Sequence, residues 1–253
     1  MDESREPTHK LIKDDPGVPL GYYLGVQFHP KITLDEKSGY DFAHRLSDYV
    51  TTNCCRFESN GWTLSSERKG LTIEVAQENL WLAGENPGGT AKEWYENRYR
   101  EVLSRFYEKF EPQYALSSRA MIRQLYPIDG DARDFLASHV MNVNPMRFGP
   151  LARPIQLLGL KVTFPPFQAE LQKGEEKKIV EEDSQVELRI ESWGTDPSKL
   201  FVEADSTWVR PNSWAGQQNE TLDVLVGRLE QISQYLTSVR AFLTHETGNN
   251  PGD

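Results

Sequence analysis

The feature that most constrains the fold of this chain is a switch between two hydrophobic periods. Apolar and polar residues alternate along Tyr22–Phe28, Val186–Ile190 and Leu200–Ala204, which is typical of strands with one buried face. Between Thr221 and Leu243, apolar residues instead recur every three or four positions, which is typical of an amphipathic helix. Strands with one covered face pair mainly antiparallel, and the helices must bury their apolar stripes against them. We therefore expect an α+β fold of two layers, with mainly antiparallel sheet and helices packed on one face.

The predicted elements come twice in nearly the same order, β-α-β-β-α and then β-α-β-β-β-α. The first set comprises a strand over 22–28, a helix over 39–53, strands over 56–68 and 71–82 with a two-residue turn at 69–70, and a helix over 90–110. The second comprises a strand over 115–128, a short helix capped by Asp131, strands over 155–164, 186–190 and 200–205, and the helix from Thr221. The order favours a duplicated unit, and the motif Leu71-Thr-Ile-Glu-Val, which recurs as Leu200-Phe-Val-Glu-Ala, supports it. The alternative is one irregular α+β domain without symmetry.

This order predicts four regions of the chain. Residues 1–18 and 246–253 are polar, contain proline and are expected to be flexible tails, flanking α+β halves at 19–112 and 113–245. The segment 155–164 is the most continuously apolar strand, so we expect it in the centre of a sheet. The charged segment 172–183 predicts a protruding turn. Thr90 and Glu93 form a capping-box pattern, and Leu229 and Ile232 lie in the middle of the last helix's apolar stripe, where we expect full burial.

The charge balance and the absent motifs exclude several classes of protein. A net charge of −10, with no run of Lys or Arg longer than two, argues against binding to nucleic acid. No apolar segment approaches the ~20 residues that span a bilayer, and the polar N-terminus is not a secretory signal, so we expect a cytoplasmic protein that does not bind membranes. The chain has no phosphate-binding loop, dinucleotide-binding turn, nucleophile elbow or paired metal-ligand motif. We therefore expect no cofactor, no metal and no assignable catalytic residue.

Adjacent cysteines, Cys54 and Cys55, lie between a predicted helix and a predicted strand. A disulfide between neighbouring residues closes a small strained ring, so we expect two reduced thiols. A redox switch or a site for a soft metal is the alternative.

Two glutamates are the leading candidates for a binding site. Glu74 and Glu203 occupy matching positions in the repeated strand motif and point away from the apolar rows. With Tyr23 and Arg123 they are predicted to line a groove between the halves, where grouped carboxylates would receive a cationic ligand or a basic segment of a partner. A solvated sheet face with cross-strand ion pairs is the plain alternative, and acid–base chemistry by paired carboxylates is a third.

Two aromatic residues in polar loops are candidates for an interface. Trp214 lies in a polar loop before the last helix, and Phe148 lies in the Pro-containing loop 142–154. Each either packs back onto the fold or anchors a partner, and the partner is a different protein or a second copy in a homodimer.

Three segments resemble an uncharacterised, sporadically distributed bacterial family of α+β proteins of similar length. They are Pro19-Leu20 leading into the first strand, Arg119-Ala-Met-Ile-Arg123, and Leu200–Asp205 followed by the long last helix. The family's mid-chain strand runs Arg-x-Gly-x-Arg-Tyr and then Asn, where this chain has Met121, Gln124 and Tyr126. The resemblance covers most of the chain and implies no activity or site residues.

The sequence thus favours a non-catalytic binding or interaction protein over two alternatives. One is a sensor of an amphipathic or cationic small molecule, because a duplicated β-α-β-β unit is similar in layout to the gyrase-inhibitor-like effector-binding domains, which hold such ligands between their two copies. The other is a carboxylate-dependent hydrolase.

Overall fold

A computed structural model of the chain describes residues 10–11, 15–142, 155–173 and 176–244. Its strands are β1 (Lys10–Leu11), β2 (Val18–His29), β3 (Arg56–Glu58), β4 (Gly61–Ser66), β5 (Leu71–Val75), β6 (Asn79–Glu85), β7 (Tyr114–Asp129), β8 (Gly159–Phe164), β9 (Phe167–Lys173), β10 (Glu176–Glu182), β11 (Ser184–Ser192), β12 (Lys199–Trp208) and β13 (Asn212–Ser213). Its helical segments are α1 (Glu36–Arg45), η1 (Thr52–Cys54), η2 (Glu67–Lys69), α2 (Ala91–Trp94), η3 (Tyr95–Tyr99), α3 (Arg100–Phe110), α4 (Ala132–Phe135), η4 (Leu136–Val140) and α5 (Gln218–Thr244).

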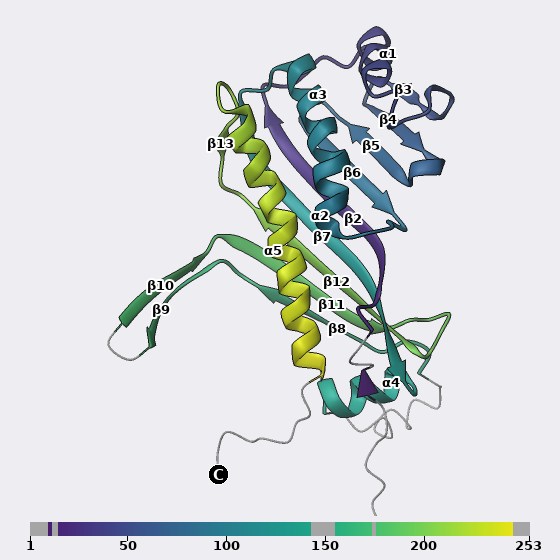
Figure 1. Ribbon diagram of the computed structural model, residues 1–253, viewed down its shortest axis with the longest axis vertical. Coiled ribbons are helices and arrows are strands. Elements are labelled where there is room, and N and C mark those ends of the chain that lie inside the picture. Colours follow the sequence, from purple (N-terminus) through teal and green to yellow (C-terminus); the bar gives the residue numbers. More distant parts are fainter. Residues whose placement is uncertain (1–9, 12–14, 143–154, 174–175, 245–253) are drawn as a thin grey trace, which may run out of the picture.

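One large antiparallel sheet organises the molecule (Figure 1). Its strands follow the order β3-β4-β5-β6-β2-β7-β12-β11-β8, and the short strands β1 and β13 also pair with β7. The two long strands β2 and β7 lie side by side at its centre. A separate two-stranded sheet, β9–β10, projects from the body as an arm. The predicted α+β fold with mainly antiparallel sheet is confirmed.

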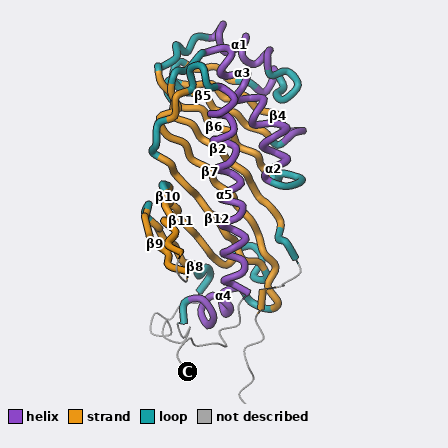
Figure 2. Tube along the Cα trace, turned by 60° about the vertical axis from the view of Figure 1, so that its left-hand side comes forward, coloured by secondary structure: helices purple, strands orange, loops and turns teal. Residues whose placement is uncertain are grey.

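The helices lie on one face of this sheet. Figure 2 shows α5 running along its length, with α2, α3 and α1 beside it towards one end and α4 at the other. On that face one hydrophobic cluster joins residues from both halves of the chain, for example Leu24 on β2, Phe106 on α3 and Leu225 on α5. Leu229 and Ile232 are 1% and 2% exposed, so their predicted burial is confirmed.

The predicted helix caps are also present. The Thr90 side chain accepts from the backbone N–H of Glu93, and the Glu93 carboxylate accepts from the backbone N–H of Thr90. The helical run that follows ends at Glu111, whose φ of 48° is left-handed, immediately before Pro112. The Asp131 carboxylate accepts from the backbone N–H of Arg133 at the start of α4.

Several predicted elements are corrected. The strands expected over 56–68 and 71–82 each divide into two, because short turns follow Glu58 and Val75 and the turn η2 replaces the two-residue hairpin. The first helix runs from Glu36, capped by Asp35, to Arg45 rather than over 39–53, and the separate turn η1 covers Thr52–Cys54. Strand β8 begins only at Gly159, with 155–158 outside it, and it pairs only with β11, so it lies at the edge of the sheet and not at its centre. The described residues of the segment 172–183 lie in the paired strands β9 and β10 of the projecting arm and at the start of the next connection, so the segment protrudes as predicted but contains paired strands.

Part of the expected N-terminal tail belongs to the sheet. Lys10 and Leu11 pair with Asp129 and Ile128, and Leu11 is buried in the core. Strand β2 already begins at Val18. The other expected tail, 246–253, lies outside the described residues.

The order of strands is the same on the two sides of the central pair. Outward from β2 come β6, β5 and β4, and outward from β7 come β12, β11 and β8. Counted outward from the central pair, β12 is the first strand beside β7, whereas β5 is the second strand from β2. The repeated Leu-x-apolar-Glu motif therefore does not mark corresponding strands, and Glu74 and Glu203 do not hold corresponding positions.

Candidate functional site

The face of the sheet opposite the helices is called the open face below. It carries the alternate residues of each strand that point away from the helices, most of which are polar. In β2, Tyr22 and Leu24 belong to the core beneath the helices, so the intervening Tyr23 points to the other side. Residues paired in register share a face, which places three cross-strand rows on the open face. The rows run Thr63, Glu74, Trp81, Gly25, Arg119, Thr207, Gln185; then Thr72, Ala83, Tyr23, Met121, Asp205, Glu187; then Glu85, Gly21, Arg123, Glu203, Arg189, Lys161.

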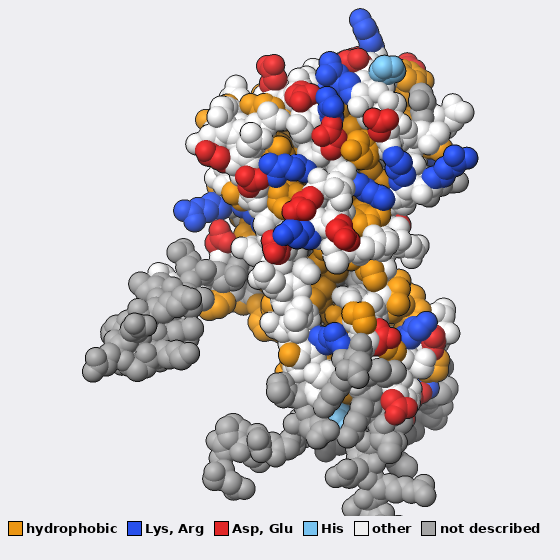
Figure 3. All heavy atoms as spheres, viewed as in Figure 1, with side chains coloured by type: hydrophobic (Ala, Val, Ile, Leu, Met, Phe, Trp, Pro, Cys, Tyr) orange, Lys and Arg blue, Asp and Glu red, His pale blue; other side chains and the backbone are white. Residues whose placement is uncertain are grey.

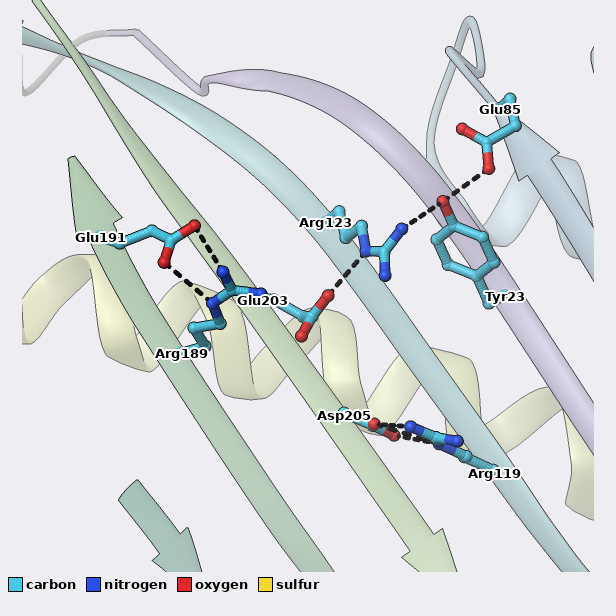
Figure 4. Close-up of polar contacts among 8 residues, drawn as sticks. All are labelled: Tyr23, Glu85, Arg119, Arg123, Arg189, Glu191, Glu203 and Asp205. Carbon is cyan, nitrogen blue, oxygen red and sulfur yellow. Dashed lines mark hydrogen bonds and ion pairs between the residues drawn. The ribbon is translucent and has the colours of Figure 1, made fainter. Parts of the chain in front are cut away.

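A chain of polar contacts crosses four strands on this face (Figure 4). Arg123 donates from Nε to Glu203 Oε2 at 2.6 Å and from a terminal nitrogen to the Tyr23 hydroxyl at 3.1 Å, and Tyr23 donates to Glu85 Oε1 at 2.8 Å. Burial of Tyr23, together with its hydrogen bond to Glu85, raises its pKa to about 12. The Tyr23 ring lies over Gly21, where an added Cβ would come within 2.4 Å of its hydroxyl oxygen.

A second contact, beside this chain, joins Arg119 to Asp205. The Arg119 Nε lies 2.8 and 3.0 Å from the two carboxylate oxygens, and a terminal nitrogen also donates to Oδ2. Asp205 is only 7% exposed, while the Arg119 side chain is half exposed. The hydrogen bonds to Asp205 raise the pKa of Arg119. The pair is thus rigid on the carboxylate side and open to solvent on the guanidinium side.

Aromatic rings flank these ion pairs on both sides. Trp81 lies over Gly25 and stacks on Tyr23, with ring centroids 6.1 Å apart and an interplanar angle of 24°. On the other side Trp193 stacks on Phe201 at 5.6 Å. Tyr23, Ala83 and Met121 form a small apolar cluster separate from the main core, with Trp81 packed on it. The open face therefore combines apolar, aromatic and charged groups.

The carboxylates of this face are mostly paired. Besides the two pairs above, Arg189 bonds Glu191 at 2.8 Å and Lys161 bonds Glu187 at 2.9 Å. Around Glu203 the expected groove of mutually repelling carboxylates is not formed, because cations from a neighbouring strand or position bind Glu203, Asp205, Glu187 and Glu191. Figure 3 shows that acidic and basic side chains also intermingle on the helix side.

Several depressions open on this face, and two of them involve residues of the three rows next to Trp81. One, of about 630 Å³, is lined by Trp81, Arg119, Asp205, Glu187 and neighbouring polar groups. The other, of about 400 Å³, is lined by Glu74, Arg56 and the edge of Trp81 among others.

The predicted site residues divide accordingly. The structure brings Tyr23, Arg123 and Glu203 into direct contact, but Glu74 lies on β5, beyond β2 and β6 from Arg123. Glu74 lines the smaller depression and Glu203 lines neither, so the two do not share a groove. Trp81 and Arg119 are not among the site residues expected from the sequence. Their one signal in the sequence is that they alternate with residues of the same strands that belong to the core.

The two predicted interface aromatics give no exposed anchor. Trp214 has no exposed surface and stacks on Tyr107, with ring centroids 5.8 Å apart. It therefore packs onto its own fold and does not present an anchor to a partner. Phe148 lies outside the described residues.

The remaining candidates carry no site in the described part of the chain. Cys54 and Cys55 are free thiols at the end of η1, and burial raises the pKa of Cys55, which disfavours its reactive thiolate. Among the described residues, no group of three His, Cys, Asp or Glu side chains is placed to share a metal ion. None of the described helices has both the length and the apolar character required to cross a bilayer.

Comparison with protein-family models and with curated proteins finds no match to this chain. The geometry of the open face is accordingly the basis for the functional proposal.

Proposed function

We propose that the protein is a non-catalytic interaction protein that binds a protein partner through the open face. One observation carries the proposal: the described helices all cover one side of the sheet, and the other side presents ordered aromatic and arginine side chains. Tryptophan, tyrosine and arginine are the residues that most often dominate binding energy at protein interfaces.

The arrangement of these residues favours a macromolecular partner over a small molecule. The larger depression is open and shallow, whereas small-molecule sites enclose most of their ligand. The Arg119 and Arg123 guanidiniums are already held by carboxylates, so little side-chain freedom is lost when a partner covers them. Their charges are already neutralised, which limits the cost of desolvation at the centre of an interface.

The same contacts disfavour the hydrolase alternative. Acid–base catalysis by Glu203 or Asp205 would require a carboxylate free to exchange a proton with a substrate. Guanidinium groups occupy both carboxylates.

A sensor of small amphipathic cations is the second candidate. Its support is the position of Trp81 beside Glu187 and Asp205 in the larger depression, since an aromatic face next to carboxylates suits a cation. In this case the partner is a small ligand, and binding should appear as a rise in melting temperature with the ligand alone.

A comparison of open-face and helix-face variants tests the proposal. Trp81→Ala and Arg123→Ala should each reduce recovery of a co-purifying partner at least several-fold relative to the original protein, since central aromatic and arginine contacts dominate such interfaces. Val224→Ala, on the exposed side of α5, is the matched control and should leave recovery unchanged. Equal recovery with all variants would overturn the proposal. Stabilisation by amphipathic cations that Glu187→Gln abolishes would instead support the sensor, because Glu187 lines the larger depression.

We also infer that the two halves derive from a duplicated unit, and that the protein is cytoplasmic and belongs to the bacterial family that it resembles. The repeated order of strands about β2 and β7, and the placement of α3 and α5 on the same face, support the duplication. Superposition of the two halves in an experimental structure tests it, and non-equivalent positions of α3 and α5 would contradict it.

A further inference from the structure

A solvent-open cavity of about 620 Å³ at the edge of the open face is lined by three basic residues. It opens where η2, the loop 86–90 and the π-helical turn η3 meet, and Arg68, Lys69 and Arg98 contribute to its wall. None of the three forms an ion pair with a described residue, although the chain has a net charge of −10. By contrast, Arg100 and Arg105, on the helix that continues from η3, are both paired with carboxylates. Cations gathered without partners around one cavity suit an anionic ligand.

Contacts within the protein hold the Arg98 guanidinium in place. Its central carbon lies 3.9 Å from the centroid of the Trp94 ring, and one terminal nitrogen donates to the Lys69 carbonyl at 2.6 Å. Trp94 in turn donates from Nε1 to the Gly88 carbonyl at 2.7 Å, which ties the loop to the helix. Nε and the other terminal nitrogen of Arg98 make no hydrogen bond to the described residues. The π-helical geometry of η3 is itself a feature often found at functional sites.

The other walls leave room for an anion. Gly70 has a φ of 59°, and a Cβ there would lie 2.5 Å from the Glu85 carbonyl, so a glycine is required at this wall. A Cβ at Gly88 would meet nothing within 4 Å. The Glu85 carboxylate also lines the cavity, but it accepts the Tyr23 hydroxyl on the open face.

Two nearby donors are already engaged, which leaves the arginines as the anion-binding groups. The Lys69 ammonium donates to the Asp48 carbonyl and lies over the Tyr49 ring. The backbone N–H of Thr90, at the start of α2, donates to the Glu93 carboxylate at 2.8 Å. Binding must therefore rely on the side chains of Arg68 and Arg98.

We propose that this cavity binds a phosphate anion with two or more negative charges: inorganic phosphate, a phosphate monoester or pyrophosphate. A planar guanidinium with two free donor positions matches the oxygens of a phosphoryl group, and doubly charged oxyanions gain most from two nearby arginines. The cavity adjoins the open face and shares Thr72 and Glu85 with it, but its anion-binding groups, Arg68 and Arg98, are not part of the proposed interaction surface, so either proposal can fail without the other.

Titration with phosphate compounds tests this site. The original protein is titrated in a calorimeter with inorganic phosphate, pyrophosphate and glycerol phosphate, with sodium chloride at the same ionic strength as the reference. Arg68→Gln and Arg98→Gln should each weaken binding about tenfold or more, because each removes a charge-assisted hydrogen bond. Arg68 is exposed and has no described contact, so its variant is expected to fold normally.

The matched control is Arg210→Gln, which removes an exposed, unpaired charge outside the cavity and should bind like the original protein. A preference for glycerol phosphate over inorganic phosphate would assign an ester ligand, and equal affinities would assign the free anion. Absence of binding by all three compounds, or equal affinities for Arg68→Gln and Arg210→Gln, would overturn the proposal.

Discussion

At the scale of single residues, the open face depends on glycines that make room for aromatic rings. Gly21 and Gly25 lie in register between charged or aromatic neighbours, and the rings of Tyr23 and Trp81 lie over them. These rings then pack against each other beside the arginines. A period-two pattern shows that such residues share a face, but not that a ring lies flat over a neighbouring glycine.

The Arg119–Asp205 pair gives a prediction at this scale. Arg119→Ala leaves a nearly buried carboxylate without its cation, so we expect a loss of about 1–3 kcal/mol in the free energy of unfolding. Combined with Asp205→Ala, the loss should be smaller than the sum of the single losses. Lys161→Ala, which breaks the more exposed pair with Glu187, should cost less than about 1 kcal/mol. Urea unfolding of the three single variants and the double variant measures these losses. Additive losses at positions 119 and 205 would contradict the coupling.

At the scale of elements, the helical run after Thr90 and the last helix were the best predicted parts of the chain. Their apolar stripes act locally, as does the cap formed by Thr90 and Glu93, so the sequence places them. The helix predicted over 39–53 was placed less well, because it begins at Glu36 and ends at Arg45. The edge position of β8 was not predictable in this way, because the place of a strand in a sheet depends on long-range pairing. The break between β3 and β4 leaves one signal in the sequence: Phe57 pairs with Trp62, so the inward-facing positions change from odd to even residue numbers across the turn.

The long helix α5 gives a prediction at the scale of elements. Leu229→Ala removes a fully buried side chain between α5 and the sheet and should lower the free energy of unfolding by about 2–5 kcal/mol. Val224→Ala, on the exposed side of the same helix, should change it by less than about 0.5 kcal/mol. Denaturant unfolding of the two variants checks this, and a similar small loss in both would mean that α5 is peripheral to the core.

The cap of α4 gives a prediction about pH. Hydrogen bonds from Arg133 hold the pKa of Asp131 below its ordinary value of 3.8. A carboxyl group with a lowered pKa in the folded state adds stability above its unfolded pKa, and this is lost as the pH falls through the folded value. Asp131→Ala should therefore lower the free energy of unfolding by about 1 kcal/mol at pH 7 and by less at pH 3. An equal difference at both pH values would contradict this account.

At the scale of the whole molecule, one sheet is covered on one side and open on the other. The two-layer α+β class follows from the sequence periods because each amphipathic element must bury its apolar face. The pairing of Arg123 with Glu203 on neighbouring strands depends on register, which a single sequence does not define. For the same reason Glu74 was wrongly grouped with Glu203, whereas Tyr23 and Arg123 were correctly placed beside it.

Site-specific photo-cross-linking in the producing cells tests the central claim that the open face binds a protein partner. A photoreactive phenylalanine analogue replaces Trp81 on the open face in one variant and Val224 on the exposed side of α5 in another. We expect a discrete cross-linked adduct from position 81, lost when Arg123→Ala is added, and none of the same mass from position 224. The same adduct from both positions, or from position 224 alone, would contradict the assignment of the open face as the binding surface.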